Sequence, residues 1–445
     1  MKRLLIAIFC AFSALANGQT NSVLATGTWV KMSVAGDGIY KIDYSLFRKL
    51  GLNPDQTDPR KIRILAGNQG MLSQLNSSPR VSDLKEVAIQ MVGQDDGVFN
   101  SSDYLLFYGQ GPDQYHLDFN KGVFAYENNL YTDKNYYFVT VGPSNGLRIA
   151  DNQSLTGTYP TITEFDDFTY YETEQYNELH SGRNWYGEQF SSKTSYTIRF
   201  TVPGIVNGSD LKLIYKVMAQ SINPASFQFS LNGQPLQDKA MPTIINASYT
   251  DKGTEASDSL TISSATNQAS STTNWDVTIR FNKAATEKSI GYLDRLLFQY
   301  KRALTLYGDQ TAFSSLLSIK SSAAKYSLMQ LPAGALIWDI SDPWRPSLQA
   351  TTLEGTNTVF QAVTGPDKKY LVFSNKNFPV PVPEGKVANQ NLHGIGTTNL
   401  VIVSAPEFLS EAQRLANFRQ SRNGITTTVV TTTQVYNEFS GGKQD

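Results

Sequence analysis

Asn399-Leu-Val-Ile-Val-Ser404, close to the C-terminal end of the sequence, is a short apolar run bounded by polar residues. This pattern is typical of a fully buried strand. Farther along the chain, Ile425 to Thr432 is an unbroken run of β-branched residues, which favours a second strand. The interval between the two runs suits one helix, so the stretch predicts a parallel βαβ unit with a right-handed crossover.

Helix signals occupy that interval. Ser404-Ala-Pro-Glu407 fits a capping box, with a hydroxyl at the cap and a glutamate three residues later. Gly424 stands where a C′ glycine would end the helix. The apolar residues that fall on one helical face are Phe408, Ala412, Leu415 and Ala416.

A parallel unit of two strands cannot cover both faces of its own sheet, because parallel sheets carry helices on each side. We therefore expect this unit to be the start of an α/β domain that continues beyond Asp445. The alternative is that the unit packs with upstream strands as a small mixed sheet.

The composition narrows the class of protein. A chain of 445 residues has room for about three domains. Its formal net charge is -1, from 38 basic and 39 acidic residues, and its longest basic cluster is Arg60-Lys-Ile-Arg63. This balance argues against nucleic acid as a partner and against an electrostatic membrane anchor.

The N-terminus has the pattern of a secretory signal peptide. Met1-Lys-Arg3 precedes an apolar run from Leu4 to Leu15, and Ala14-Leu-Ala16 provides small residues for cleavage. We assign residues 1–18 to this signal. The single cysteine, Cys10, lies inside it, so the exported chain is predicted to have no thiol and no disulfide.

The rest of the chain before the βαβ unit is rich in predicted strands. Residues 19–156 carry short alternating segments separated by turn residues, as in a β-rich domain. Residues 157–306 carry longer strands and predict a jelly-roll-like β-sandwich. Residues 307–390 are predicted to form a β-rich connector, and one alternative is that it packs on the first domain and leaves the sandwich as an insertion. Residues 391–445 form the α/β segment.

Three local features refine this division. Phe227, Phe229 and Leu231 alternate with polar residues, which predicts one buried and one wet face. The low-complexity run from Asp251 to Thr273 predicts a mobile loop with a short strand inside it. Phe378-Pro-Val-Pro-Val-Pro383 must be extended, and its prolines exclude a central position in a sheet.

Candidate metal and histidine sites are weak. Gln94 to Asp103 resembles a calcium loop, but an EF-type loop would need carboxylates at Val92 and Gln94. A turn between two strands is the favoured interpretation. The three histidines are far apart in sequence and form no metal-binding motif: His116, His180 and His393. His393, in the loop just before the βαβ unit, is the nearest to a possible site, and an ordinary loop histidine is its favoured interpretation.

Carboxylates and aromatic residues suggest a second type of site. A glycosidase would need two carboxylates across one bond, and the crowded candidates are Glu164, Asp166, Asp167, Glu172 and Glu174. A solvated face is the favoured interpretation of this cluster. Trp185 and Tyr186 could stack on a sugar, although burial in the sandwich is favoured, and Trp344 is predicted to be a core or inter-domain contact. Gly109-Gln-Gly111 lacks the third glycine of a dinucleotide-binding loop and predicts a turn.

Four stretches, taken in order along the chain, resemble one family: Gly38 to Tyr44, Asp103 to Asp113, Trp338 to Pro343 and Tyr436 to Asp445. The family is that of the gingipain-like cysteine peptidases, and the resemblance is to the sortases of the type IX secretion system. It extends from about residue 24 to the last residue.

The resemblance implies that the βαβ unit opens a caspase-like peptidase domain. A histidine base and a cysteine nucleophile, expected beyond Asp445, would attack a peptide carbonyl. The implied partners are secreted cargo with a C-terminal signal, an outer-membrane β-barrel of the PorV type, and lipopolysaccharide as the acceptor at the cell surface. No cofactor, metal or catalytic residue is assigned within this sequence, and the chain alone is predicted to be inactive. The alternative is a non-catalytic surface adhesin or carbohydrate-binding protein, with the sandwich as its binding element.

Overall fold

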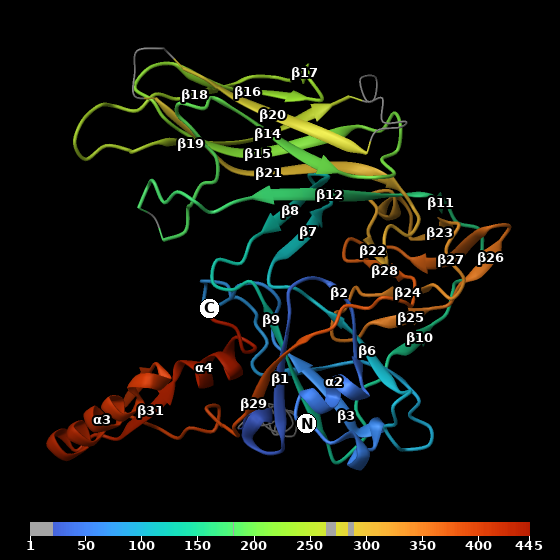
Figure 1. Ribbon diagram of the computed structural model, residues 1–445, viewed down its shortest axis with the longest axis vertical. Helices are drawn as coiled ribbons and strands as arrows, with labels where there is room; N and C mark the ends of the chain where they lie inside the picture. The colour runs from blue at the N-terminus through green and yellow to red at the C-terminus, as the bar shows by residue number, and fades with distance from the viewer. Residues whose placement is uncertain (1–20, 181, 264–272, 284–288) are drawn as a thin grey trace, which may run out of the picture.

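The computed structural model describes residues 21–180, 182–263, 273–283 and 289–445, so the predicted signal peptide lies outside the described residues. The chain is mainly β, with several sheets followed by a βαβ unit. Figure 1 shows the sandwich at one end, the N-terminal β-unit at the other, and the helical C-terminal segment projecting from the N-terminal unit. The predicted fold class is confirmed. Among the described residues, none of the helices has the length and apolar character needed to span a bilayer.

The N-terminal unit is built from two sheets that enclose one core. The first sheet has the order β29-β1-β9-β3-β4, with β29 Val382–Val387, β1 Trp29–Val34, β9 Asn135–Val141, β3 Ile62–Ala66 and β4 Lys85–Val87. The second has the order β2-β6-β5, with β2 Gly38–Asp43, β6 Tyr104–Gly109 and β5 Gln90–Val92. Helix α2 (Tyr44–Lys49), capped by the side chain of Asp43, adds Phe47 to the core.

The central unit is a two-sheet sandwich. One sheet has the order β12-β21-β15-β19, with β12 Glu164–Glu172, β21 Ile290–Ala303, β15 Leu211–Gln220 and β19 Thr254–Ile262, and β13 Gln189–Phe190 beside β21. The other has the order β14-β20-β16-β17, with β14 Ser195–Thr201, β20 Asn274–Asn282, β16 Ala225–Leu231 and β17 Gln234–Pro235, and β18 Lys239–Met241 beside β16. As predicted, Phe227, Phe229 and Leu231 are buried between the sheets.

The prediction of a loop from Asp251 to Thr273 is wrong over most of its described part. Residues 254–262 form the nine-residue strand β19, which pairs along its length with β15. Only Leu260 and Ile262 of this strand are fully buried. The side chains of Ser257, Ser259 and Thr261 are exposed, so the sequence lacks the apolar alternation that signals a strand.

The connector contributes two further sheets. Their orders are β10-β25-β24-β28-β22 and β11-β23-β27-β26. The bounds are β10 Ala150–Asn152, β25 Ser347–Gln349, β24 Leu336–Asp339, β28 Tyr370–Phe373, β22 Gln310–Phe313, β11 Thr161–Ile162, β23 Ala323–Met329, β27 Asn357–Val363 and β26 Thr352–Glu354. Trp338 and Phe373 pack with Ile39 and Tyr108 of the N-terminal unit. The exact division into domains remains a proposal.

Two connections fix the sandwich and the connector to the N-terminal unit. The hairpin of β7 (Gln114–Asp118) and β8 (Val123–Glu127) places Tyr126 on Tyr170 of β12, with ring centroids 3.9 Å apart. Strand β29 pairs with β1 at the outer edge of the first sheet. This edge position agrees with the prolines of residues 378–383, because proline cannot donate a ladder hydrogen bond.

The α/β segment consists of β30 (Leu400–Ser404), α3 (Leu409–Asn423), β31 (Thr427–Thr431) and α4 (Thr432–Phe439). The two strands pair in parallel register, as predicted. The predicted capping box is wrong, because Pro406–Phe408 is a 3-10 turn and Ser404 Oγ donates to the carbonyl of Ala405 (3.0 Å) instead. Gly424 ends α3 with a φ of 64°.

The predicted apolar face of α3 is only partly correct. Ala412 and Ala416 are buried against the strands, whereas Phe408 and Leu415 are 62% and 46% exposed. Phe408 lies in the 3-10 turn, outside the helical register. The capping box of the segment lies one helix later, where Thr431 and Gln434 cap α4 reciprocally.

The sandwich core predicts the effect of one substitution. Phe298 is fully buried and contacts the rings of Phe200 and Trp275, at 5.8 Å and 5.7 Å between centroids. We expect Phe298→Ala to destabilise the sandwich by about 3–5 kcal/mol, because it leaves a cavity among aromatic rings. The loss in the free energy of unfolding can be measured by urea titration, with hydrogen exchange of the backbone amides of β15 and β20 as the probe. Arg280→Ala, on the exposed outer face of β20, is the control and should change stability little.

Candidate functional site

The α/β segment is attached to the rest of the chain through a buried carboxylate. Glu438, on α4, has no exposed side-chain surface. Its oxygens accept hydrogen bonds from the backbone N–H groups of Leu392 (2.8 Å) and His393 (3.1 Å) and from Nε2 of Gln390 (2.9 Å). The imidazole Nδ1 of His393 lies 2.6 Å from Glu438 Oε2. Glu438 therefore holds the loop between β29 and β30 against α4.

The His393–Glu438 pair shifts both pKa values. Burial alone would lower the pKa of His393, but the hydrogen bonds to Glu438 and to the carbonyl of Ser82, together with the charges of Asp83 and Glu438, outweigh it and raise the pKa. Burial alone would raise the pKa of Glu438, but the hydrogen bonds from Leu392, Gln390 and His393 together lower it. Both shifts favour the charged pair.

The last residues enter the N-terminal unit. The ammonium of Lys443 is buried and donates to the carbonyl of Asn68, with Asn135 Oδ1 at 3.4 Å. Burial lowers the pKa of Lys443 to about 8. Gly441 and Gly67 approach so closely that a Cβ on Gly67 would lie 2.6 Å from the Cα of Gly441. This backbone contact leaves no room for a side chain at either position.

A groove of about 1050 Å³ lies between the α/β segment and the N-terminal unit. One wall is formed by β29 and its neighbours, including Lys31, Lys386 and Val387. The other wall comes from the residues that follow β30 and β31, including Pro406 and Gln434. The carboxyl ends of the two parallel strands therefore open into this groove.

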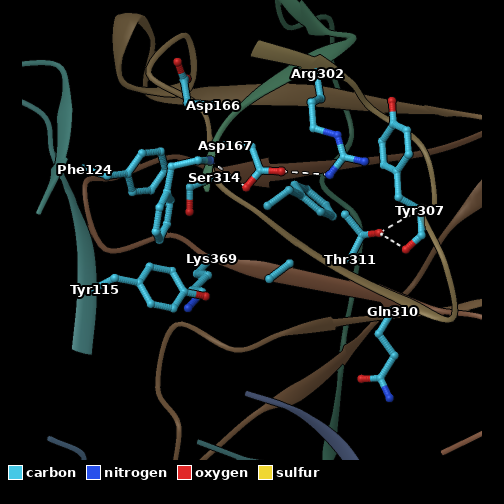
Figure 2. A pocket seen from close by; sticks show the side chains of 13 residues that line it. Tyr115, Phe124, Asp166, Asp167, Arg302, Tyr307, Gln310, Thr311, Ser314 and Lys369 are labelled. Atoms are coloured by element: carbon cyan, nitrogen blue, oxygen red, sulfur yellow. Dashed lines mark hydrogen bonds and ion pairs between the residues drawn. The ribbon is translucent and has the colours of Figure 1, made fainter. Parts of the chain in front are cut away.

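A smaller pocket of about 320 Å³ lies where the hairpin β7–β8, the sandwich and the connector meet (Figure 2). Its charged side chains already have partners. Arg302 donates to Asp167 Oδ2 (2.8 Å) and stacks on Tyr307, and Lys369 lies 3.5 Å from Asp37 Oδ2. The Arg302–Asp167 pair lies within the sandwich, whereas the stacking of Arg302 on Tyr307 and the Lys369–Asp37 pair reach the connector and the N-terminal unit. We interpret the pocket as a structural junction.

The acidic residues of β12 do not form a solvated face, contrary to the sequence-based interpretation. Asp166 is buried and accepts from the N–H of Leu316 (2.7 Å), Glu164 pairs with Lys301 (2.6 Å), and Asp167 pairs with Arg302. Glu172 accepts from the hydroxyl of Tyr170. The carboxylates are partnered because β12 lies between β21 and the hairpin β7–β8.

The remaining candidates are spread over the molecule. His116 and His180 are exposed and far in sequence from His393, which is ion-paired and so is not an ordinary loop histidine. Tyr186 is buried, as favoured, but Trp185 is 40% exposed. The carbonyl of Trp344 accepts from the N–H of Ala88 (2.8 Å), an inter-domain contact.

The candidate calcium loop is a turn, whereas the turn predicted at residues 109–111 is only partly correct, because Gly109 ends strand β6 and Gly111 lies in the connection to β7. Residues 93–103 join the paired strands β5 and β6, and Asp96 and Asp103 accept hydrogen bonds from backbone N–H groups of their own loop. The N–H of Gly111 donates to Asp37 Oδ1 (2.8 Å). In the part of the chain that the structure describes, no group of three or more His, Cys, Asp or Glu side chains could hold a metal ion.

The α/β segment also matches a known family. Residues 395–445 match the profile of peptidase family C25. The crystal structure of dimeric latent PorU from Porphyromonas gingivalis superposes on this chain with a TM-score of 0.83 at 22% identity, covering 99% of this chain and 40% of that one. The chain shares its fold with PorU. It spans 40% of the length of the PorU chain it matches.

Two carbohydrate-active proteins match much more weakly. The CBM36-1 domain of a xylanase from the hindgut metagenome of Trinervitermes trinervoides matches with a TM-score of 0.16 at 13% identity, covering 30% of this chain and 95% of that one. A β-porphyranase from Bacteroides plebeius matches with a TM-score of 0.20 at 11% identity, covering 62% and 35%. No curated protein matches the sequence. The similarity to PorU covers almost the whole chain, whereas these two cover parts of it.

The residues that attach the C25 segment could not be identified from the sequence. Glu438 and Lys443 lie in Tyr436 to Asp445, a stretch that resembles the gingipain-like peptidases, but neither belongs to a motif with a known role. Their partners, such as Asn68, are hundreds of residues away. The one available signal was the combination of a charged residue with glycines in Gly441-Gly442-Lys443, which suits a close backbone approach.

Loss of the Glu438 carboxylate should release the α/β segment. Glu438→Ala leaves the N–H groups of Leu392 and His393 without an acceptor, and removal of one partner from a buried pair costs about 3–5 kcal/mol. We expect cleavage of residues 388–399 by thermolysin to accelerate about 100-fold, because proteolysis follows the population of the open form. Glu407→Ala, on the exposed surface of the same segment, is the matched control. Equal cleavage rates in the two variants would contradict this role.

The same contact should depend on pH. Because the pKa of His393 is raised in the folded protein, the stability that this side chain contributes is fully present below its ordinary pKa of 6.5. That stability is lost as the pH rises through the raised pKa. Because the pKa of Glu438 is lowered in the folded protein, the stability that its carboxylate contributes is fully present above its ordinary pKa of 4.5. That stability is lost as the pH falls through the lowered pKa. The difference in melting temperature between the wild type and Glu438→Gln should therefore be largest between pH 4.5 and 6.5. A difference that does not change with pH would argue against the charged pair.

Proposed function

We propose that this chain is the scaffold and first βαβ unit of a PorU-like cysteine peptidase of family C25. One observation carries the proposal: the chain shares the PorU fold over 99% of its length, and the family C25 match begins at the βαβ unit. The β-units would serve to place the peptidase domain, because they hold α4 through Glu438 and the residues after it through Lys443.

The chemistry of this proposal belongs to residues beyond Asp445. A cysteine thiolate activated by a histidine would attack a peptide carbonyl and form a thioester. As a sortase, the protein would remove the C-terminal signal of secreted cargo and transfer the cargo to lipopolysaccharide. It would act at the cell surface, beside an outer-membrane β-barrel of the PorV type.

Exposed apolar side chains on the α/β segment support the proposal that it belongs to a larger domain. Val401 and Val403 of β30 are 50% and 55% exposed, and Leu415 and Phe418 of α3 are 46% and 56% exposed. In a parallel sheet such residues are covered on both faces. Further strands and helices of a C25 domain would bury this apolar surface.

Peptidase activity is the direct test. We expect the 445-residue chain to hydrolyse no peptide, because its one cysteine, Cys10, lies in the predicted signal. The protein produced from the continued open reading frame should cleave a C-terminal signal from a model cargo, and iodoacetamide should abolish the cleavage. A continued reading frame without a thiol-dependent activity would overturn the proposal, as would hydrolysis by the 445-residue chain.

A substitution on β30 tests the missing layer independently of activity. Val403→Asp should change the stability of the 445-residue chain by no more than about 0.5 kcal/mol, because the side chain is half exposed. In the longer protein the same change should cost several-fold more, since it would bury an unpaired carboxylate. Melting curves of the wild type and Val403→Asp, recorded for both chain lengths, measure this contrast. Thr428→Asp on β31 serves as the comparison on the neighbouring strand. Equal effects in the two lengths would mean that no later segment covers β30.

A further inference from the structure

A loop of the N-terminal unit lies against the last residues of the chain. Residues 67–82 leave the first sheet after β3 and lead toward β4. The carbonyl of Asn68 accepts a hydrogen bond from the ammonium of Lys443, and the N–H of Leu72 donates to Asp445 Oδ2 (2.8 Å). We call residues 67–82 the clamp loop, because these two contacts and a third one hold the end of the α/β segment.

The third contact is made by His393, whose imidazole lies between two hydrogen-bond acceptors. Its Nδ1 is 2.6 Å from Glu438 Oε2, and its Nε2 is 2.7 Å from the carbonyl oxygen of Ser82. A carbonyl oxygen can only accept a hydrogen bond, and the carboxylate of Glu438 already accepts from several N–H groups. Both ring nitrogens must therefore donate, so the geometry requires the imidazolium form.

The surroundings of the ring favour the same form. Burial of the ring lowers the pKa of His393, but the hydrogen bonds to Glu438 and Ser82 and the negative charges of Asp83 and Glu438 together raise it. The ring of Phe439 stacks on the imidazole with centroids 4.7 Å apart, and the side chain of His393 is 12% exposed. Little water therefore competes for either ring nitrogen.

A neutral imidazole carries one proton and can serve one of the two acceptors. We expect the proton to stay on Nδ1, because the carboxylate of Glu438 has no exposed surface and would otherwise lose a charge-assisted hydrogen bond. Nε2 would then direct a lone pair at the carbonyl oxygen of Ser82, and two acceptors at that distance repel each other. Ser82 is exposed, so its carbonyl can bond to water instead at little cost in free energy.

The far end of the clamp loop stays fixed when this contact is lost. Asp83 is buried, and its carboxylate accepts from the N–H groups of Val23 (2.7 Å) and Leu84 (2.7 Å). Neither bond involves His393. Any release is therefore confined to residues 67–82, and the contacts of Glu438 remain.

We propose that the clamp loop responds to pH: it is closed on the C-terminal residues while His393 is an imidazolium, and it opens when the ring becomes neutral. Because the pKa of His393 is raised in the closed state, closure is complete below the ordinary value of 6.5 and is lost as the pH rises through the raised value. The consequence for a peptidase rests on the proposed function. There the clamp loop would couple pH to how firmly the first unit of a C25 domain is held.

Lys443 cannot produce this response. Burial lowers the pKa of its ammonium to about 8, so the contribution of Lys443 to closure rises as the pH passes through that value. Its effect on the clamp loop therefore has the opposite sign to that of His393. A release with rising pH identifies the imidazole as its source.

Hydrogen exchange of the 445-residue chain measures this opening directly. The reporters are the amides of Leu72 and Val81, which donate in the closed loop to Asp445 Oδ2 and to Asn68 Oδ1 (3.4 Å). Between pH 6.5 and about pH 9, with rates corrected for intrinsic exchange, we expect their protection to fall about tenfold for each pH unit by which closure raises the pKa of His393. NMR of the ¹⁵N-labelled imidazole gives that pKa and should show the neutral ring protonated on Nδ1.

Two variants separate the imidazole from other causes. His393→Gln removes the titrating group, so the amides of Leu72 and Val81 should be weakly protected at every pH in this range. His116→Gln, which alters an exposed histidine on β7, is the matched control and should keep the wild-type response. The amide of Leu392 donates to Glu438, and its protection throughout shows that each variant is folded.

Four results would overturn the proposal. They are protection of Leu72 and Val81 that does not change with pH, the same decline in His393→Gln, a simultaneous loss of protection at Leu392, and a neutral ring protonated on Nε2. The proposed function is tested separately. A pH-responsive clamp loop without thiol-dependent cleavage by the longer protein would retain the clamp and remove that function, and cleavage without a pH-responsive loop would do the reverse.

Discussion

The arrangement of the C-terminal segment depends on one buried carboxylate. Glu438 is placed by α4, yet most of its partners belong to the loop of residues 390–393, and so it fixes the helix to the loop that leaves the N-terminal sheet. A buried carboxylate is costly unless its oxygens are satisfied. Here backbone N–H groups, an amide and an imidazole satisfy them, so any displacement of α4 would leave either the charge or the backbone groups unpaired. The contact therefore selects one orientation of the α/β segment.

Local patterns in the sequence were sufficient to predict the elements. The apolar run at Leu400–Ser404, the β-branched run at Thr427–Thr431 and Gly424 specified the βαβ unit, because each signal depends on neighbours within a few residues. The sandwich strand at Ala225–Leu231 was evident for the same reason. Strand β19 was predicted only in part, as a short strand within residues 251–273, because it is ordered by its pairing with β15 while its side chains mostly face water. Its order comes from the partner strand, and a partner is not visible in the local sequence.

The candidate site could be predicted far less well than the fold. Ser404-Ala-Pro-Glu407 and Thr431-Thr-Thr-Gln434 both satisfy the spacing of a capping box, and only the second forms one. Lys443 looks like a solvated charge in the sequence, but its ammonium is buried against the loop at Asn68 and the start of β9 at Asn135. The carboxylates of β12 seemed exposed because they are crowded, and their partners on β21 lie more than a hundred residues away. In each case the decisive contact is long-range.

The edge strand β29 connects these observations. Its prolines and its lysine are residues that prevent edge strands from pairing with other chains, and Pro383 and Lys386 have that effect along its outer side. The same strand leads directly into the loop that Glu438 holds, so the orientation of the α/β segment and the width of the groove are set by one continuous stretch of backbone. A shift of β29 along β1 would change both together. The β-units are therefore more than a support for the C25 segment, because they determine what lies opposite the carboxyl ends of its strands.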